Sequence, residues 1–354
     1  MAAPSPQPLP SFDAFSALFT EEARRLKEFS AESEYTARAL AYAKPLADAQ
    51  LPVIFSGLHF CALVGYSDNF VERAVGSPSL FYRKFFIKKK NGNLREISEP
   101  LPSLKQIQEW IYQQILRRVP VSPAAKAFVP GKTLKDSSRF HIGQKFVLRI
   151  DIENFFPTIT RRRVFGLFRS FGYSSSVSGL MSRLCCLDDA LPQGGVCSPY
   201  LSNLIVRNLD ARLLAFCKTR NLRYTRYADD FTVSGNEFSF GIVDFVKRAI
   251  REEGFNVNED KTAIMRAASR QTVVGVVVNR RQNAPREFRR NLRQHGYFIK
   301  KHGLDGHLAK LGEHRSGARE YYLGKVAFSL MLNPKDRDAL SLRALLIPDV
   351  PKNP

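Results

Sequence analysis

The sequence predicts an α+β protein in which helices flank an antiparallel sheet. Two stretches have the pattern of paired strands. Residues 82–97 contain Asn91-Gly92, the strongest short signal for a tight hairpin, and strands at 222–227 and 231–234 meet at a second turn. Between and around these strands, apolar residues recur at intervals of three and four, which predicts helices.

The composition favours a globular protein with a polyanionic partner. At 354 residues and 44% hydrophobic content, the chain can bury a large core and hold two or three domains. It carries 54 basic against 33 acidic residues, a formal charge of +21. The excess is uneven, with 11 Lys or Arg against 3 Asp or Glu between residues 280 and 319. This concentration indicates a nucleic-acid surface more than a generic basic one.

The cysteines and the apolar runs bear on the compartment. The five cysteines form no C-x-x-C pair and no zinc-ligand spacing, so we expect reduced, mostly buried thiols. The longest apolar run, at 51–65, is too short to span a membrane, and the N-terminus lacks the pattern of a signal peptide. We therefore expect a cytoplasmic protein without a membrane partner.

The N-terminal part predicts a proline-rich, disordered lead-in over residues 1–11, a helix, a hairpin and a second helix. The first helix follows from the apolar spacing of Phe15, Phe19 and Phe29, with Leu18 and Leu26. The hairpin at 82–97 carries cations beside its turn, which suit a phosphate grip and equally a solvated surface. Pro102 begins a helix with apolar residues on one face.

Three acidic residues stand at the ends of predicted strands. Asp229 and Asp230 are adjacent at the turn between two strands, where like charges raise each other's pKa unless a cation is present. Asp151 ends the apolar strand at 146–151. The next helix begins only at Thr160, so Asp151 is poorly placed to cap it and a ligand role is favoured. Carboxylate oxygens are the ligands that Mg²⁺ prefers.

The middle of the chain contains a glycine-bearing loop at 191–199. Ser198 is expected to cap a helix that Pro199 begins, and the loop before it could approach a nucleotide or a template, or be an ordinary junction. Further along, we expect a helix at 240–250, Lys261 in a loop, a strand at 272–278 containing Gly275, and helices at 286–301 and 318–332.

Taken in order, these elements resemble the fingers and palm of reverse transcriptases. The matching positions are the Arg95 hairpin, residues 151–156, the loop at 191–199, Tyr227-Ala228-Asp229-Asp230, the Lys261 loop and the Gly275 strand. They span about 81–279, over half of the chain. The resemblance implies a right-hand polymerase fold. Its parts would be an N-terminal extension at 1–50, fingers at 51–145, a palm at 146–279 and a basic thumb at 280–354.

The resemblance also implies an RNA-directed DNA polymerase with a two-metal site. Asp151, Asp229 and Asp230 would hold two Mg²⁺ ions, one activating the primer hydroxyl and one neutralising the leaving pyrophosphate. Lys261 would be a candidate proton donor to the pyrophosphate.

Substrate and RNA contacts follow from the same resemblance. Phe156 would reject the ribose 2′-OH of rNTPs, and Arg95 with Lys88 would hold the triphosphate. Gln193, Gly194 and Tyr227 would contact the template and the incoming dNTP. The expected RNA-binding residues are His141, Gly275, Arg286, Arg289, Arg290, Lys300 and Lys301.

Within the family, the sequence resembles the bacterial retron type. The resemblance rests on Phe155-Phe156-Pro157, Val164-Phe165-Gly166 and Cys185-Cys186. The chain departs from the retron pattern where Ser137-Ser138 replace Asn-Ala before His141, and where Val274 replaces Thr in Val-Thr-Gly. A retron enzyme would use a cognate structured non-coding RNA as template and primer. It would start from a guanosine 2′-OH to give branched RNA–DNA (msDNA), and commonly serves phage defence with a separate effector protein.

Two alternatives stay open. A stand-alone intron-like or abortive-infection reverse transcriptase would make unbranched DNA, and an inactive scaffold would bind RNA without synthesis. The scaffold is disfavoured because the three aspartates, Phe156 and Lys261 are all present. An RNA-templated RNA polymerase is disfavoured because such enzymes more often carry Gly where Ala228 stands.

Overall fold

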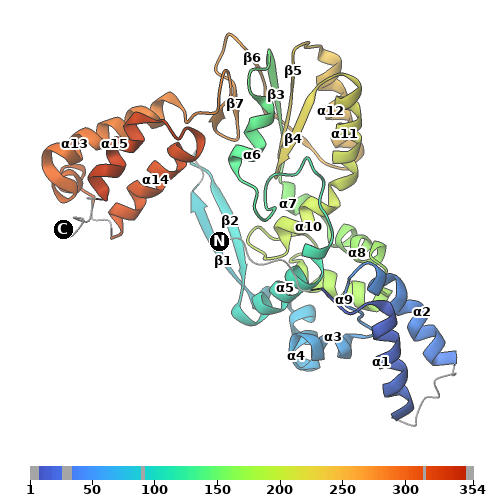
Figure 1. Ribbon diagram of the computed structural model, residues 1–354. Coiled ribbons are helices and arrows are strands. Elements are labelled where there is room, and N and C mark those ends of the chain that lie inside the picture. Colours follow the sequence, from blue (N-terminus) through green and yellow to red (C-terminus); the bar gives the residue numbers. More distant parts are fainter. Residues whose placement is uncertain (1–7, 26–33, 89–91, 314–315, 348–354) are drawn as a thin grey trace. The chain divides into compact units, whose positions relative to one another are not determined.

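The computed structural model describes residues 8–25, 34–88, 92–313 and 316–347 (Figure 1). The chain divides into two compact units, each assembled from segments far apart in the sequence. The first unit comprises Met1–Gly131, Ile152–Arg212 and Glu252–Asn256, and the second comprises Lys132–Asp151, Leu213–Arg251 and Val257–Pro354. The four-part division into extension, fingers, palm and thumb stays a prediction.

Helices dominate the first unit. The expected N-terminal helix is present as α1, in which Phe19 packs against Phe55 with ring centroids 5.6 Å apart. Residues 1–7 of the expected lead-in, Leu26 and Phe29 lie outside the described residues. The helices are α1 (Phe12–Arg25), α2 (Glu34–Asp48), α3 (Gly57–Val64), α4 (Asp68–Gly76), α5 (Pro102–Gln114), α7 (Phe155–Thr158), α8 (Arg161–Ser170), α9 (Ser175–Cys185) and α10 (Ser198–Ile205).

Helix α5 contacts several elements of this unit through one buried side chain. It begins at Pro102 as predicted, because a proline at the first helical position loses no hydrogen bond. Gln108, fully buried on this helix, donates to the Tyr82 hydroxyl and to the Leu184 carbonyl, both at 2.8 Å. Its side-chain oxygen accepts from the backbone N–H of Val196 at 3.0 Å. One amide thus ties together a hairpin strand, helix α9 and the glycine-bearing loop.

The predicted hairpin is confirmed. Strands β1 (Tyr82–Lys88) and β2 (Leu94–Pro100) pair antiparallel, with Phe85 opposite Ile97. The expected turn residue Asn91 lies outside the described residues, while Gly92 has φ +87°, which only glycine adopts without strain.

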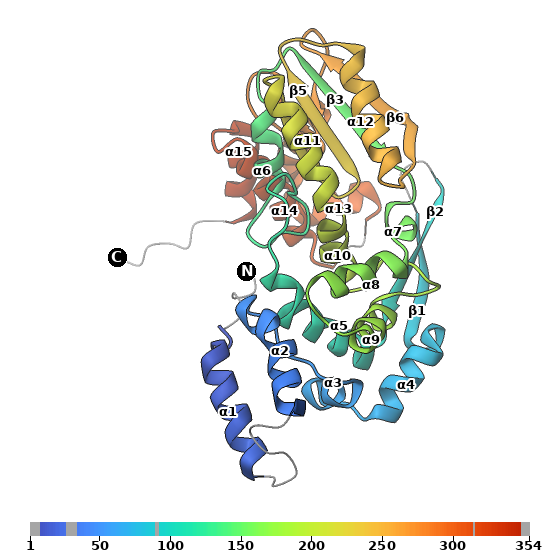
Figure 2. The same ribbon diagram turned by 90° about the vertical axis from the view of Figure 1, so that its right-hand side faces the viewer.

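The second unit contains the antiparallel sheet. It has the order β4-β5-β3-β6, formed by β3 (Phe146–Ile152), β4 (Arg223–Tyr227), β5 (Asp230–Gly235) and β6 (Val257–Arg266). Helices α11 (Arg207–Thr219) and α12 (Phe240–Glu252) lie along one side of it in both views (Figure 1 and Figure 2). Between these helices, Phe216 stacks on Phe245 with centroids 3.7 Å apart.

The two faces of the sheet differ because alternate residues of a strand point to opposite sides. One face carries the buried apolar residues Leu148, Ile150, Phe231 and Val233. The other carries polar residues and lies against α6 (Leu134–Ser138) and the short 3₁₀ segment Arg139–His141. The apolar strand predicted at 146–151 is present as β3, and its Val147 is a buried apolar residue on the otherwise polar face.

Two local predictions were wrong. Lys261 lies in strand β6, not in a loop, because this edge strand pairs with β3 despite its charged composition. Residues 272–278 form a small hairpin, β7 (Thr272–Val273) and β8 (Val276–Val277), not one strand. The chain reverses at Val274 and Gly275, whose φ values of +49° and +78° are incompatible with a continuous strand.

The start of α10 also differs from the prediction. Ser198 is already helical, and Cys197 occupies the capping position with its thiol donating to the Gln108 carbonyl at 3.1 Å. The Ser198 hydroxyl is buried and has no hydrogen-bond partner among the described residues. The helix therefore begins one residue earlier than the serine–proline pattern suggests.

Three helices form the C-terminal part of the second unit. The predicted helices at 286–301 and 318–332 are present in α13 (Arg286–Leu311) and α14 (Ala318–Leu332). Helix α13 continues beyond residue 301 through a kink at Gly303, where φ is +71°. A third helix, α15 (Arg337–Leu346), was not predicted; Asp336 caps it, and Leu342 packs with Leu292 and Tyr322 in a shared core.

The structure bears on two further predictions, the state of the cysteines and the presence of a membrane span. All five cysteines are free and buried, as expected. Across the described parts of the chain, no helix is both long and apolar enough to cross a bilayer.

Candidate active site

The sheet of the second unit brings two of the predicted aspartates together. Asp151 on β3 and Asp230 on β5 are direct partners in the antiparallel register, and Tyr227 on β4 is paired with Asp230 from the other side. All three therefore stand at one end of the sheet. The pleat places Asp151 on the same face as Arg149, and Asp230 on the same face as Thr232.

A strained turn holds the third aspartate beside them. Asp229 follows Ala228, whose φ of +57° is unusual for a residue other than glycine. The guanidinium of Arg226 donates to the Ala228 carbonyl at 3.1 Å, and this arginine is fully buried. Arg226 was not among the predicted site residues. Its position on the apolar face of β4, where the strand alternation calls for a hydrophobic residue, is the signal that could have identified it.

The electrostatics of this group favour a bound cation. Burial, together with the negative charges of Asp151 and Asp229 and against the opposing effect of Arg149, raises the pKa of Asp230 to about 7. The Thr232 hydroxyl donates to Asp230 at 3.3 Å. Negative charge is thus concentrated at a half-buried position, where a divalent ion would stabilise the ionised carboxylate.

Lys261 is paired with the other carboxylate. Its ammonium nitrogen lies 2.8 Å from Asp151 Oδ2, with the lysine side chain 57% exposed and that of Asp151 14% exposed. The lysine therefore reaches the aspartate cluster from β6 while keeping access to solvent. This position suits an amine that meets a substrate phosphate.

These residues fit Mg²⁺, although they do not form a complete cage. Within the described ranges, no set of three or more His, Cys, Asp or Glu side chains is spaced to hold a metal ion. Mg²⁺ needs only one or two protein carboxylates, because it keeps several waters and takes oxygens from substrate phosphates. The in-register pair of Asp151 and Asp230, with charge crowding that a cation would relieve, meets that requirement.

In the first unit, two of the predicted substrate residues, Arg95 and Gln193, line a cavity of about 470 Å³. Its lining includes Arg95, Gln193, Asn154 and Pro157. Lys88 is not among the described residues that line it. The hairpin register also puts Lys88 and Arg95 on opposite faces, since Arg95 is paired with Ile87. The expectation that both cations hold one triphosphate is therefore not supported, and Arg95 alone is retained.

Gly194 lies against the hairpin. The backbone N–H of Ser98 donates to the Gln193 carbonyl at 2.7 Å, which fixes the loop on β2. Gly194 has φ +119°, and a Cβ there would lie 2.8 Å from the Ser98 carbonyl oxygen and 2.9 Å from Ile97 Cγ2. The glycine is thus required both by conformation and by space.

Phe156 lies in the short helix α7 and is half-buried. Its ring contacts Phe155 at 5.4 Å and Phe128 at 6.2 Å between centroids. Phe156 is not itself among the described lining residues of the cavity, whereas its neighbour Pro157 is.

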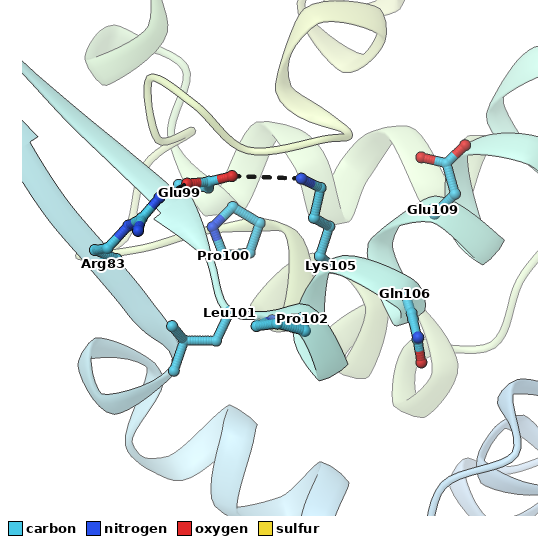
Figure 3. Close-up of a pocket in the computed structure, with 8 residues that line it drawn as sticks. All are labelled: Arg83, Glu99, Pro100, Leu101, Pro102, Lys105, Gln106 and Glu109. Atoms are coloured by element: carbon cyan, nitrogen blue, oxygen red, sulfur yellow. Dashed lines mark hydrogen bonds and ion pairs between the residues drawn. The ribbon is translucent and has the colours of Figure 1, made fainter.

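A second cavity of the first unit, of about 530 Å³, contains none of the predicted site residues (Figure 3). Glu99 pairs there with Arg83 at 2.6 Å and with Lys105 at 3.3 Å. The hydrogen bond from Arg83, with Lys105, holds the pKa of Glu99 below its usual range. Since Glu99 and Glu109 together balance the charges of Arg83 and Lys105, the lining has no net positive charge and is a poor phosphate site.

Most of the predicted RNA-binding residues are accessible. Gly275 is exposed at the turn of the β7–β8 hairpin, and Arg289 is half-buried on α13. The other predicted RNA-binding residues of α13, Arg286, Arg290, Lys300 and Lys301, are exposed.

His141 is the exception, and its predicted direct contact with RNA is not supported. It is fully buried against the polar face of the sheet. Its Nδ1 lies 2.7 Å from the Ser234 hydroxyl and its Nε2 lies 2.8 Å from the Thr225 hydroxyl. A neutral imidazole has one N–H, so one ring nitrogen donates and the other accepts. The histidine therefore links β4 to β5 through its two ring nitrogens.

The buried state of His141 predicts a pH dependence of stability. Burial, with Arg223 nearby, lowers the pKa of His141 to about 3. Because this is below the unfolded value of about 6.5, its contribution is complete above that pH and is lost as pH falls towards 3. We expect the free energy of unfolding to fall by about 1.4 kcal/mol per pH unit from this group below pH 6.

The measurement is urea denaturation from pH 7 to pH 4 for the parent and for His141→Asn. The variant should be less stable at pH 7 and should lose less stability on acidification. Comparing the two curves separates His141 from the other histidines. Equal slopes in both proteins would contradict the buried, neutral histidine.

Comparison with known proteins gives the class of protein. Residues 87–295, more than half of the chain, match the family model described as reverse transcriptase (RNA-dependent DNA polymerase). The chain therefore belongs to the reverse transcriptase family.

Within that family, the similarity is to retron enzymes. The retron Ec86 reverse transcriptase of Escherichia coli is 37% identical over 202 residues, covering 56% of this chain and 63% of the relative. The retron Mx65 reverse transcriptase of Myxococcus xanthus is 32% identical over 282 residues, covering 74% of this chain and 64% of the relative. The matches thus span just under two thirds of these relatives. The predicted resemblance to the retron type is confirmed.

Among solved structures, apo telomerase from Candida tropicalis aligns over 75% of this chain and 56% of that chain. The TM-score is 0.46 and the sequence identity is 12%.

Proposed function

We propose that this protein is a retron-type reverse transcriptase that copies RNA into DNA from dNTPs. The observation that carries the proposal is the in-register pair of Asp151 and Asp230, with Lys261 2.8 Å from Asp151, in a member of the reverse transcriptase family. The three carboxylates expected from the motifs thus lie at one end of one sheet. An RNA-binding scaffold without activity would have no need for this charge crowding.

In this proposal, Asp151, Asp229 and Asp230 hold Mg²⁺, with two ions bound during synthesis. When bound, the metal supplies Lewis-acid activation of the attacking hydroxyl and stabilises charge on the phosphates. Lys261 is proposed to donate a proton to the leaving pyrophosphate. Its exposed ammonium group beside Asp151 supports this role. Arg226 keeps the turn that carries Asp229 in its strained conformation.

Tyr227 is proposed to contact the incoming dNTP. Arg95 is proposed to bind the triphosphate, and Gln193 with Gly194 to pack against the template and incoming nucleotide. Phe156 is proposed as the gate that excludes the ribose 2′-OH. This choice is supported by the bulk of the ring, which contacts the rings of Phe128 and Phe155.

The proposed RNA partner is a cognate structured non-coding RNA that serves as template and primer. The exposed cations of α13 would contact its phosphates, and the turn at Gly275 would support the primer. Priming from a guanosine 2′-OH would give branched RNA–DNA, and the biological role would be anti-phage defence with a separate effector protein. Free, buried cysteines favour a cytoplasmic setting.

The first experiment is to isolate nucleic acid that co-purifies with the protein from its native host. After RNase treatment, we expect a discrete short DNA whose gel mobility changes when a debranching enzyme is added. The shift is expected because a 2′–5′ branch keeps a ribonucleotide attached to the DNA.

DNA that does not shift would reject the retron priming and favour the alternative, an intron-like or abortive-infection enzyme that makes unbranched DNA. RNA without any DNA would favour the inactive scaffold. The control is the same purification with Asp229→Asn, which should yield the RNA but no DNA.

A further inference from the structure

Phe128 has a backbone conformation that bulky residues rarely adopt. Its φ is +59°, in the left-handed region that favours glycine and asparagine. The ring is 41% exposed, so deep burial does not offset the strain. Strain of this kind persists only where the surrounding structure fixes it, and it is often found beside functional sites.

Residues 119–128, which include Phe128, are anchored on helix α10 by two hydrogen bonds. The side-chain amide of Asn203, itself fully buried, donates to the carbonyl of Ala127 at 2.8 Å. Nearer the start of the segment, the Tyr200 hydroxyl donates to the Val119 carbonyl at 3.1 Å. The residue directly before Phe128 is therefore fixed by a side chain of the helix that follows the glycine-bearing loop.

The fixed conformation holds the Phe128 ring against Phe156. The two ring centroids are 6.2 Å apart with an interplanar angle of 52°, within the range of favourable aromatic pairs. Phe156 also contacts Phe155, whose ring lies 5.8 Å from Phe255. Phe156 thus has two aromatic neighbours, and Phe128 is the one whose backbone is strained.

We propose that Phe128 is a positioning residue that sets sugar selectivity by restricting the ring of Phe156. This inference rests on the proposed function, in which Phe156 is the gate against rNTPs. If the Phe156 ring could rotate away, the space it denies to a 2′-OH would open. The strain at Phe128 is then tolerated because it keeps the gate in one rotamer.

The test distinguishes the effect of the Phe128 ring from the effect of its backbone conformation. Phe128→Asn removes the ring but keeps a residue that tolerates the left-handed conformation, and Phe128→Tyr keeps the ring. We measure kcat/KM for a dNTP and for the matching rNTP on a primed RNA template. In Phe128→Asn, discrimination against the rNTP should fall about 2- to 10-fold, mainly through a lower KM for the rNTP. Phe128→Tyr should retain the parental ratio.

A double-mutant comparison distinguishes this inference from the gate assignment. If Phe156→Ala and Phe128→Asn each lower discrimination alone, and Phe128→Asn adds nothing in the Phe156→Ala background, both ideas are supported. If Phe156→Ala lowers discrimination and Phe128→Asn alone leaves it unchanged, the positioning role is rejected and the gate stands. If Phe156→Ala has no effect, the gate itself is rejected, and the inference fails with it.

The matched control is Phe240→Ala, which removes another exposed aromatic ring, 70% exposed, far along the chain at the start of α12. It should leave the sugar ratio unchanged. Thermal unfolding of Phe128→Asn should occur at or above the parental temperature, because the strain is relieved. An equal loss of dNTP and rNTP incorporation with a lower unfolding temperature would indicate a structural role and overturn the proposal.

Discussion

Replacing Asp230 with Asn is expected to abolish DNA synthesis, lowering kcat/KM by about 10³-fold or more, and Asp229→Asn should behave in the same way. The loss follows because each substitution removes a negative charge from the group proposed to hold Mg²⁺. Metal-ion stabilisation of the transition state is worth several kcal/mol. The measurement is steady-state dNTP incorporation on a primed RNA template at saturating Mg²⁺.

Two readouts show that such a loss is chemical and not caused by unfolding. Since the folded environment raises the pKa of Asp230, its ionised form is disfavoured there, and the neutral Asn should not lower the unfolding temperature at pH 8 without metal. Affinity for the RNA should be unchanged, because the exposed cations of α13 remain. The control Asp244→Asn alters an exposed aspartate on α12 and should retain full activity. Polymerisation that survives in Asp230→Asn would overturn the metal assignment.

Gly194→Ala is expected to destabilise the protein by about 1–3 kcal/mol and to impair dNTP binding. The added methyl group would lie 2.8 Å from the Ser98 carbonyl oxygen, and the φ of +119° is unfavourable for alanine. To relieve the clash, the loop must move away from β2, which breaks the hydrogen bond between Ser98 N–H and the Gln193 carbonyl. The urea midpoint and the KM for dNTPs report the two effects.

The matched control for this variant is Gly166→Ala. Gly166 lies in the interior of helix α8 in the same unit, with no heavy atom within 4 Å of an added Cβ. Alanine should stabilise that helix by about 0.5–1 kcal/mol. A Gly194→Ala protein with parental stability and parental KM would show that the loop does not need this close approach to the hairpin.

Several errors of the sequence analysis have one physical origin. Edge strands and short hairpins bury little, so their sequences carry weak patterns. Lys261 was expected in a loop because β6 is polar, and the β7–β8 hairpin was read as one strand because its residues are β-branched. Helix α15 was missed because its apolar residues have a partner only after α13 and α14 have folded.

His141 shows a different limit. A sequence motif marks the residue as important but cannot distinguish a ligand contact from a buried structural bond. Only the packing of residues 139–141 on the polar face of the sheet reveals that both ring nitrogens are used by Ser234 and Thr225.

The sequence by itself determined the fold class, the hairpin, most of the helices and the three aspartates, because strand alternation, helical spacing and turn residues are local properties of the chain. The tertiary structure alone decided which of these residues meet. Asp151 and Asp230 are 79 residues apart and become partners through the register of β3 and β5. The rings of Phe128 and Phe156 come into contact, and Asn203 donates to the carbonyl of Ala127, the residue before Phe128. Such contacts depend on long-range packing, which no local pattern encodes.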